Sequence, residues 1–269
     1  MLSFFFLIYL YTITKLQQIK IMEQKFKLPT ETIDLPSKGL LYPESNPLAS
    51  GKLEMKYMTA KEEDILTNQN YISKGTVIDK LLQSLIITKI DYNDLLVGDK
   101  NALLVAARIL GYGKDYEFTY KNEKITVDLS TLEPKQLDES VIKKGKNEFQ
   151  FIFPSTGTNI TFKLLTHRDE QAINQELNGL KRINKDSSPE LSTRLKYMIL
   201  SVEGSYEKKD VREFVDNYLL AKDSRLFREY VKSIQPDINL TFNYDGPDGF
   251  EEGVTIPIGI NFLWPDVTV

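Results

Sequence analysis

The clearest pattern in the sequence is an apolar stripe at helical spacing within residues 59–113. In the middle of this segment, apolar residues recur at i, i+1, i+4, i+5, i+8 and i+9: Val77, Ile78, Leu81, Leu82, Leu85 and Ile86. Thr59 and Glu62 form a capping box that begins an earlier helix, and Gly98-Asp99 begins a later helix that ends at Gly111-Tyr112-Gly113. The segment is therefore predicted to hold three short helices that pack together as a scaffold.

Beyond residue 113 the pattern changes to the alternation that is typical of strands. Residues 116–120 and 124–129 flank a turn at Lys121-Asn122-Glu123, and residues 148–153 and 159–165 form a second strand pair. Thr166 then caps a helix that runs to about Ile183. Three more apolar stripes follow, centred on residues 191–202, 211–219 and 226–234, and Pro236 ends them. Residues 238–244 and 254–258 predict a third hairpin.

Because runs of helices and runs of strands are segregated, the predicted fold class is α+β. It has a mostly helical body, three short antiparallel strand pairs and an extended proline-rich N-terminal arm. The predicted segments are the arm (22–58), three helices (59–113), two strand pairs (114–166), a helical segment (167–236) and a C-terminal hairpin with a tail (237–269). Residues 59–269 are expected to form one compact domain.

Residues 1–21 do not fit this organisation. The apolar run at residues 4–11 has no basic residue before it and no small-residue cleavage site after it, and it is too short to span a bilayer. A charge-flanked anchor remains an alternative. We expect that translation begins at Met22 and that residues 1–21 are an upstream extension without a structural role.

The predicted arm is rich in proline and glycine, with extended backbone from Leu35 to Pro43 and a turn at Lys38-Gly39. Its apolar side chains suggest contact with a partner, and the predicted interface residues are Leu35, Pro36, Leu40, Leu41, Tyr42 and Trp264. The alternatives are an ordered loop packed on its own core and, for Trp264, a core position that closes the last hairpin. Deletion of residues 22–51 is predicted to leave a folded body that no longer assembles.

The composition narrows the possible functions. The chain has 269 residues, of which 41% are apolar, and a net charge of −4, which does not favour a nucleic-acid surface. It has no cysteine, which excludes disulfides and thiolate metal sites, and with one histidine the usual zinc sites and catalytic triads are hard to build. We therefore expect no cofactor and no membrane partner.

Several polar groups are candidates for catalysis or ion binding. His167 with Asp169 and Glu170 suits a general base, but three polar residues in a first helical turn are also what capping requires. The acidic run 62–64 and the turn 245–249 are more typical of solvated surfaces than of cation sites, and the basic turn 143–146 of a solvated hairpin tip. Arg108 is expected to pair with a carboxylate such as Asp99 or Asp94, or to cap carbonyls. No set of residues supplies a nucleophile, a base and an electrophile together.

Several separated stretches, in order and spacing, resemble the T-even phage baseplate protein family of contractile-tailed phages. They are Leu35-Pro36-Ser37-Lys38-Gly39 with Tyr42-Pro43, Glu54-Met55, residues 59–66, Lys74-Gly75 with Ile78-Asp79, Gly98-Asp99 with residues 108–112, Ile256-Pro257, and Phe262-Leu263-Trp264-Pro265. The resemblance covers most of residues 22–266 and rests on the ordered set, since none of its motifs is specific alone.

The resemblance implies a non-enzymatic component or assembly factor of the baseplate hub, located in the virion tail and, during assembly, in the host cytoplasm. Its partners would be other tail and hub proteins. Many members carry Cys-x-x-Cys pairs in the hairpins that correspond to residues 116–129 and 238–258, whereas this chain has none, so zinc is not expected. Two alternatives remain: a transient tail-assembly chaperone, and an envelope-degrading hydrolase that would depend on Glu62, Asp169 or Glu170.

Overall fold

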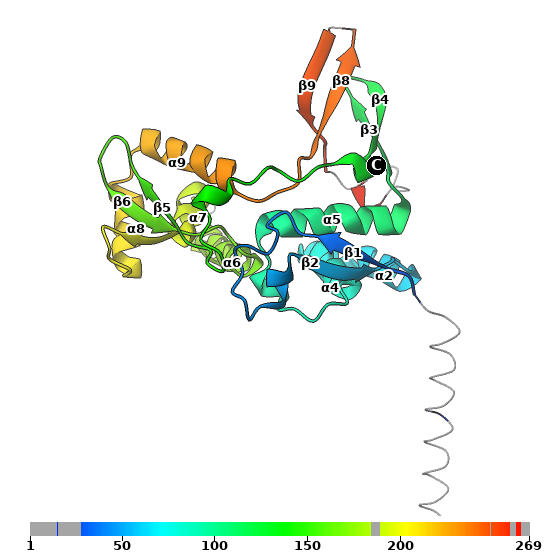
Figure 1. Ribbon diagram of the computed structural model, residues 1–269, viewed down its shortest axis with the longest axis horizontal. Coiled ribbons are helices and arrows are strands. Elements are labelled where there is room, and N and C mark those ends of the chain that lie inside the picture. The colour runs from blue at the N-terminus through cyan, green and yellow to red at the C-terminus, as the bar shows by residue number, and fades with distance from the viewer. Residues whose placement is uncertain (1–14, 16–27, 184–188, 248, 259–261, 265–269) are drawn as a thin grey trace, which may run out of the picture.

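The structure is a computed structural model that describes Lys15 and residues 28–183, 189–247, 249–258 and 262–264. Over these residues it has eight α-helices and four small antiparallel sheets, which confirms the predicted α+β class (Figure 1). The helices are α2 (Ala60–Leu66), α3 (Gln69–Ser73), α4 (Val77–Leu85), α5 (Val97–Tyr112), α6 (His167–Ile183), α7 (Glu190–Met198), α8 (Lys208–Asn217) and α9 (Ala221–Ile234). The predicted upstream extension lies outside the described residues, apart from Lys15.

The strands pair mainly with sequence neighbours. They are β1 (Thr30–Asp34) with β2 (Lys52–Lys56), β3 (Asp115–Tyr120) with β4 (Glu123–Asp128), β5 (Phe149–Ile152) with β6 (Asn159–Phe162) and β7 (Ile199–Val202), and β8 (Thr241–Gly246) with β9 (Gly249–Thr255). The three hairpins expected from the sequence are present. The pair β1–β2 and the third strand β7 were not predicted.

Helix α5 lies at the centre of the molecule. Helices α2 and α4 and the pair β1–β2 lie on one side of it, and the chain that leads to the β8–β9 hairpin passes on the other side (Figure 1). Nine of its residues are buried, among them Leu103, Ala107 and Leu110. Gly98 in its first turn lies against the chain at Pro236, where an added Cβ would stand 1.7 Å from the Pro236 carbonyl oxygen. Only glycine, which has no Cβ, allows the two backbones to come this close. Gly98 therefore sets how closely the C-terminal segment crosses α5.

The segment that was predicted as an extended arm is part of the body. Its central portion folds as a turn between β1 and β2. Gly39 and Gly51 lie close together in this turn: a Cβ on Gly39 would stand 2.4 Å from the Ala49 carbonyl oxygen, and a Cβ on Gly51 would stand 2.6 Å from the Lys38 carbonyl oxygen. The backbone N–H of Leu35 donates to the Gly51 carbonyl at 2.8 Å. One core cluster runs from Leu35 to Leu263, so the compact unit begins before residue 59.

The second lobe consists of α6–α9 around the three-stranded sheet, with Phe153, Phe162 and Phe227 fully buried between sheet and helices. Helix α6 has the predicted bounds. The helix predicted over residues 191–202 is wrong beyond Met198, because residues 199–202 pair with β6 as β7. An apolar run next to a helix fits either state, and pairing with β6 decides between them.

The hairpins β3–β4 and β8–β9 pack against each other above α5 (Figure 1). Their aromatic rings interlock edge to face, with centroids 5.2 Å apart for Phe118–Phe242, 5.6 Å for Tyr120–Phe242 and 5.1 Å for Tyr120–Tyr244. Such geometry adds stabilisation beyond the buried area. The two hairpins are thus joined by an aromatic ladder, defined here as Phe118, Tyr120, Phe242 and Tyr244.

Candidate interaction site

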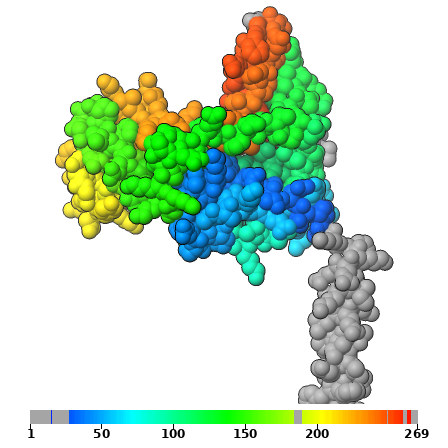
Figure 2. All heavy atoms as spheres, viewed as in Figure 1, coloured from blue at the N-terminus to red at the C-terminus, as the bar shows by residue number. Residues whose placement is uncertain are grey.

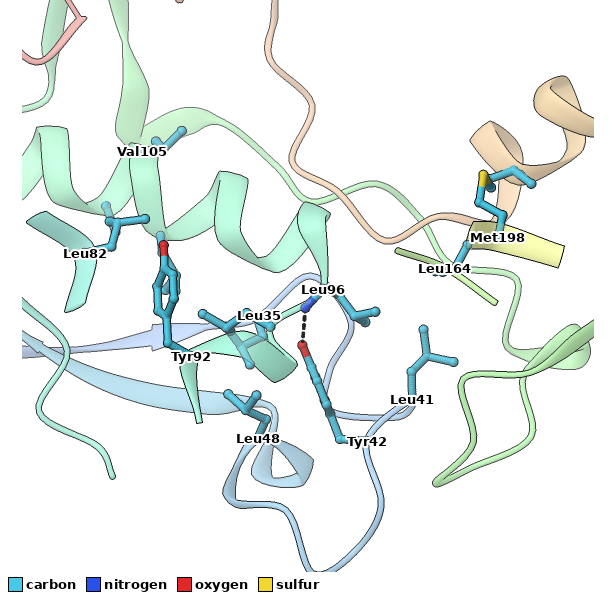
Figure 3. Close-up of a cluster of buried hydrophobic side chains, with 14 of the residues drawn as sticks. Leu35, Leu41, Tyr42, Leu48, Leu82, Tyr92, Leu96, Val105, Leu164 and Met198 are labelled. Atoms are coloured by element: carbon cyan, nitrogen blue, oxygen red, sulfur yellow. Dashed lines mark hydrogen bonds between the residues drawn. The ribbon is translucent and has the colours of Figure 1, made fainter. Parts of the chain in front are cut away.

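The predicted interface segment is held to α5 through the buried carboxylate of Asp99. Asp99 is 0% exposed and accepts hydrogen bonds from the Ser37 backbone N–H at 2.9 Å, the Ser37 hydroxyl at 2.7 Å and the Tyr42 hydroxyl at 2.6 Å. Tyr42 also accepts a bond from the Leu96 N–H at 2.9 Å (Figure 3). A buried carboxylate needs such donors. Asp99 therefore fixes the 35–43 turn on the first turn of α5.

The predicted interface residues in this turn point into the protein's own core. Leu35, Leu41 and Tyr42 join Leu48 and Leu96 in one apolar cluster (Figure 3). Leu35 and Leu41 are each 2% exposed. Pro36 is buried and Leu40 is half-buried. This arrangement corresponds to the alternative expectation, an ordered loop on its own core, and it leaves little of these side chains for a partner.

Trp264 also lies against the body of the chain. Its indole Nε1–H donates to the carbonyl oxygen of Leu66 at the end of α2, at 3.1 Å, and its ring packs on the core cluster while half-buried. A tryptophan whose N–H has a partner is satisfied within the fold. Trp264 closes the C-terminal segment onto α2, which corresponds to the alternative core position more closely than to an interface anchor.

Two of the candidate carboxylates cap helices. Glu62 accepts from Lys56 at 2.8 Å, from the Thr59 hydroxyl at 2.6 Å and from Ser84 at 2.7 Å, and Asp169 accepts from the Thr166 hydroxyl at 2.8 Å. Burial opposes ionisation of Glu62, but these hydrogen bonds outweigh it and lower its pKa to about 2. Both predicted caps at Thr59 and Thr166 are confirmed. Their carboxylates are occupied by structural bonds.

His167 belongs to a polar cluster with the buried Tyr92 and the half-buried Asp79 and Lys100. Asp79 forms an ion pair with Lys100 at 2.5 Å and accepts from the Tyr92 hydroxyl at 3.0 Å, and His167 Nε2 lies 3.7 Å from Asp79. Burial lowers the pKa of His167, and Lys100 adds to that effect while Asp79 opposes it. The cluster resembles a general-base arrangement in its residue types. Its members link α4, α5 and α6 in the interior, and His167 is only 3% exposed.

Arg108 caps carbonyls, one of its two expected roles. Its guanidinium donates to the carbonyl oxygens of Gly113 at 3.0 Å and Asp115 at 3.1 Å. These groups are at the exit of α5 and the start of β3, where carbonyls lack helical partners. Arg108 therefore fixes the direction in which the chain leaves α5 for the first hairpin.

The hairpin tips are joined by polar contacts as well as by the aromatic ladder. Lys121 pairs with Glu251, the Tyr120 hydroxyl donates to Glu251 at 3.0 Å, and the Tyr244 hydroxyl donates to Glu123 at 3.0 Å. Aromatic packing and these polar contacts hold the two hairpins together. In the described part of the chain, no group of three or more His, Asp or Glu side chains is placed to hold a metal ion.

A concave surface lies between α9 and the base of the β8–β9 hairpin, and we term it the α9–hairpin groove. It has a volume of about 570 Å³, within the usual range for binding sites. The hollow between the α9 lobe and the raised hairpins is visible in Figure 2. Its charged residues are Lys135, Glu170, Arg194, Arg228, Lys232 and Asp237. None of these residues is among the predicted interface residues. Glu170 was considered only as a catalytic group.

A second accessible feature is the outer edge of β1. The backbone N–H of Tyr57 donates to the Pro29 carbonyl at 3.2 Å, so Pro29 and Tyr57 form a hydrogen-bonded pair at the start of the β1–β2 ladder. Because such pairs alternate along an antiparallel ladder, the backbone N–H and C=O groups of Thr30, Thr32 and Asp34 point away from β2. Among the described residues these groups have no strand partner. The opposite edge of β2 is covered, since Ile87 N–H donates to Glu54. An open edge of this kind can accept a further strand.

The described helices include none that is both long and apolar enough to cross a membrane. Comparisons of the chain with protein-family models, with curated proteins and with solved structures found no match. The site is therefore defined by its own geometry: buried carboxylates that organise the fold, and a charged groove that remains accessible.

Proposed function

We propose that the protein is a structural or assembly component of the central hub of a contractile phage tail baseplate. It acts by contacts with other tail proteins and without catalysis. The observation that carries the proposal is that separated stretches of the family resemblance meet in space. Ser37, in the stretch at residues 35–39, binds Asp99, in the stretch at residues 98–99. The Leu66 carbonyl, in the stretch at residues 59–66, accepts a hydrogen bond from Trp264, in the stretch at residues 262–265.

This convergence supports a shared scaffold. The two bonds join residues that lie 62 and 198 positions apart in the chain, and they hold the separated stretches in one frame. The accessible features add further support, because a charged groove and an open strand edge are surfaces through which proteins bind one another. Of the groups considered for catalysis, Glu62 and Asp169 are bonded as helix caps and His167 is buried, while Glu170 is paired with Arg194.

The test is mass spectrometry of purified phage particles, with peptides mapped along this chain. The hub proposal expects peptides from residue 22 onward at a few copies per particle. Abundant protein in infected-cell lysate that is missing from both particles and isolated tail intermediates would contradict a hub component. Protein found in tail intermediates but missing from finished particles would assign it to assembly alone.

An envelope hydrolase is tested separately with the purified protein on peptidoglycan. We expect no hydrolysis. Glu170 is the one proposed catalytic carboxylate that lines the α9–hairpin groove, where Arg194 holds it through two bonds at 2.6 and 2.9 Å. Hydrolysis by the unaltered protein that is lost in Glu170→Gln would overturn the non-catalytic proposal.

A further inference from the structure

The α9–hairpin groove has an excess of positive charge on a protein whose net charge is negative. Four cationic side chains and two carboxylates line it, and the whole chain carries −4. Arg194 and Glu170 neutralise each other in a bidentate pair. Asp237 accepts from the Asn101 side-chain amide at 3.0 Å. Asp237 keeps its negative charge, so the three remaining cations Lys135, Arg228 and Lys232, which we term the cationic wall, leave the groove with a net charge of +2.

The two α9 cations in this wall lack acidic partners. Arg228 Nε donates only to the Ser224 carbonyl, one turn back in its own helix, at 3.3 Å. Neither Arg228 nor Lys232 forms an ion pair with any carboxylate of the described residues. In contrast, Arg225 on the same helix is paired with Glu229 at 2.9 Å. The spacing of Arg228 and Lys232, i and i+4, places both on the same face of α9.

Apart from its charged residues, the groove is lined by apolar side chains and by the neutral polar residues Gln235, Asn239, Thr241 and Thr255. Val97, Leu165 and Ile238 are half-buried at its lining, next to the buried side chains of Met198 and Val231. Partly exposed aliphatic side chains gain stabilisation when apolar groups cover them. A ligand that fits this groove must therefore offer apolar groups and negative charge together.

We propose that the α9–hairpin groove binds an acidic segment of a partner protein, with carboxylates on Arg228 and Lys232 and alternate apolar side chains on Val97, Leu165 and Ile238. This names the partner chemistry for the proposed function, and it rests on that function only for the biological source of the segment. A nucleic acid fits less well, because the groove also holds the carboxylates of Glu170 and Asp237, and because a phosphate backbone does not use the apolar lining.

The test uses the purified full-length protein and three labelled eight-residue peptides that alternate Leu with Glu, Gln or Lys. Fluorescence anisotropy is expected to show binding of the Glu-Leu peptide, at least about ten-fold weaker binding of the Gln-Leu peptide, and none of the Lys-Leu peptide. Binding is expected to weaken between about 0.05 M and 0.5 M salt, because screening reduces attraction between accessible charges.

The critical variant is Arg228→Glu with Lys232→Glu. A matched control, Lys222→Glu with Arg225→Glu, changes the net charge by the same amount on the same helix but outside the groove. The groove variant is expected to lose at least about ten-fold in affinity for the Glu-Leu peptide, and the control less than about two-fold. Circular dichroism melting of both variants confirms that the helices are folded.

Three results would overturn the inference. The first is absence of Glu-Leu binding at millimolar protein, the second is equal loss in the groove and control variants, and the third is displacement of the peptide by single-stranded DNA but not by excess unlabelled Glu-Leu peptide. Self-association of the unaltered protein, abolished by the groove variant in analytical ultracentrifugation, would reassign the groove to a second copy of the chain. These readouts do not depend on whether the protein is found in phage particles.

Discussion

Asp99 shows how one side chain can organise two distant parts of a chain. Its carboxylate is fully buried, and burial raises its pKa while hydrogen bonds from Tyr42 and Ser37 oppose that rise. Three donors converge on it, and none is a cation. Removal of the acceptor would leave Ser37 and Tyr42 with unsatisfied buried groups, which is more costly than the loss of the bonds themselves.

We therefore expect Asp99→Ala to lower the free energy of unfolding by about 3 kcal/mol. The measurement is urea unfolding followed by circular dichroism. Asp64→Ala is the matched control, because Asp64 is exposed on α2, and it is expected to change the stability by less than about 0.5 kcal/mol. An equal loss of stability in the two variants would show that the hydrogen bonds to Asp99 do not stabilise the fold.

Glu62 makes a prediction about acid. Its folded pKa of about 2 is below the ordinary value of 4.5, so its contribution is complete above about pH 4.5 and is lost as the pH falls towards 2. At pH 7, Glu62→Gln should cost about 2–3 kcal/mol, and the two proteins should converge in stability near pH 2. Thermal unfolding across this range measures it. Glu63→Gln, on the exposed face of the same turn, is expected to show no such convergence.

At the scale of elements, the crossing of α5 by the C-terminal segment depends on Gly98. Gly98→Ala improves helix propensity, but the new Cβ would stand 1.7 Å from the Pro236 carbonyl oxygen, a backbone atom that cannot rotate away. We expect a net loss of at least about 2 kcal/mol. Gly179→Ala in α6 provides the opposite case, because nothing lies within 4 Å of its Cβ, and it should stabilise the protein by about 0.5–1 kcal/mol. Chemical denaturation of both variants measures the change in the free energy of unfolding, which is expected to be a loss for Gly98→Ala and a gain for Gly179→Ala.

The aromatic ladder can be examined as a coupled unit. A double-mutant cycle with Tyr120→Leu and Phe242→Leu, read by thermal unfolding, should give a coupling of about 0.5–1.5 kcal/mol. Strictly additive effects would mean that the two hairpins do not depend on this contact. Addition of zinc is expected to leave the melting temperature unchanged, because the hairpins have no cysteine ligands.

Local signals in the sequence were sufficient for the features that depend on neighbouring residues. The capping box at Thr59, the helix cap at Thr166, the bounds of α6 and the hairpin with its turn at residues 121–123 follow from short-range chemistry. Strands β1 and β2 have weaker signals because a long turn separates them, and β7 follows α7 without a break. The α9–hairpin groove has no sequence signal, since its walls come from residues 97 to 255 and meet only in the folded chain.

At the scale of the whole molecule, the burial of the 35–43 turn changes what a truncation should do. The deletion of residues 22–51 removes Leu35, Leu41 and Leu48 from the core. It also removes all three donors to Asp99, which belong to Ser37 and Tyr42. We expect the truncated chain to unfold or aggregate instead of leaving a folded body. Size-exclusion chromatography and near-ultraviolet circular dichroism measure this, and a monodisperse chain with native-like tertiary signal would restore the idea of a separable arm.

The bond from Trp264 to Leu66 also has a consequence for the time course of folding. It joins residues 198 positions apart, and Tyr116 reaches Pro257 over 141 positions. Contacts of such sequence separation form slowly, because long loops must close before any stabilisation is gained. On the ribosome, the contact between α2 and Trp264 would thus form only after nearly the whole chain has emerged. Because Trp264 is the single tryptophan of the protein, its fluorescence would report when the C-terminal segment closes on α2.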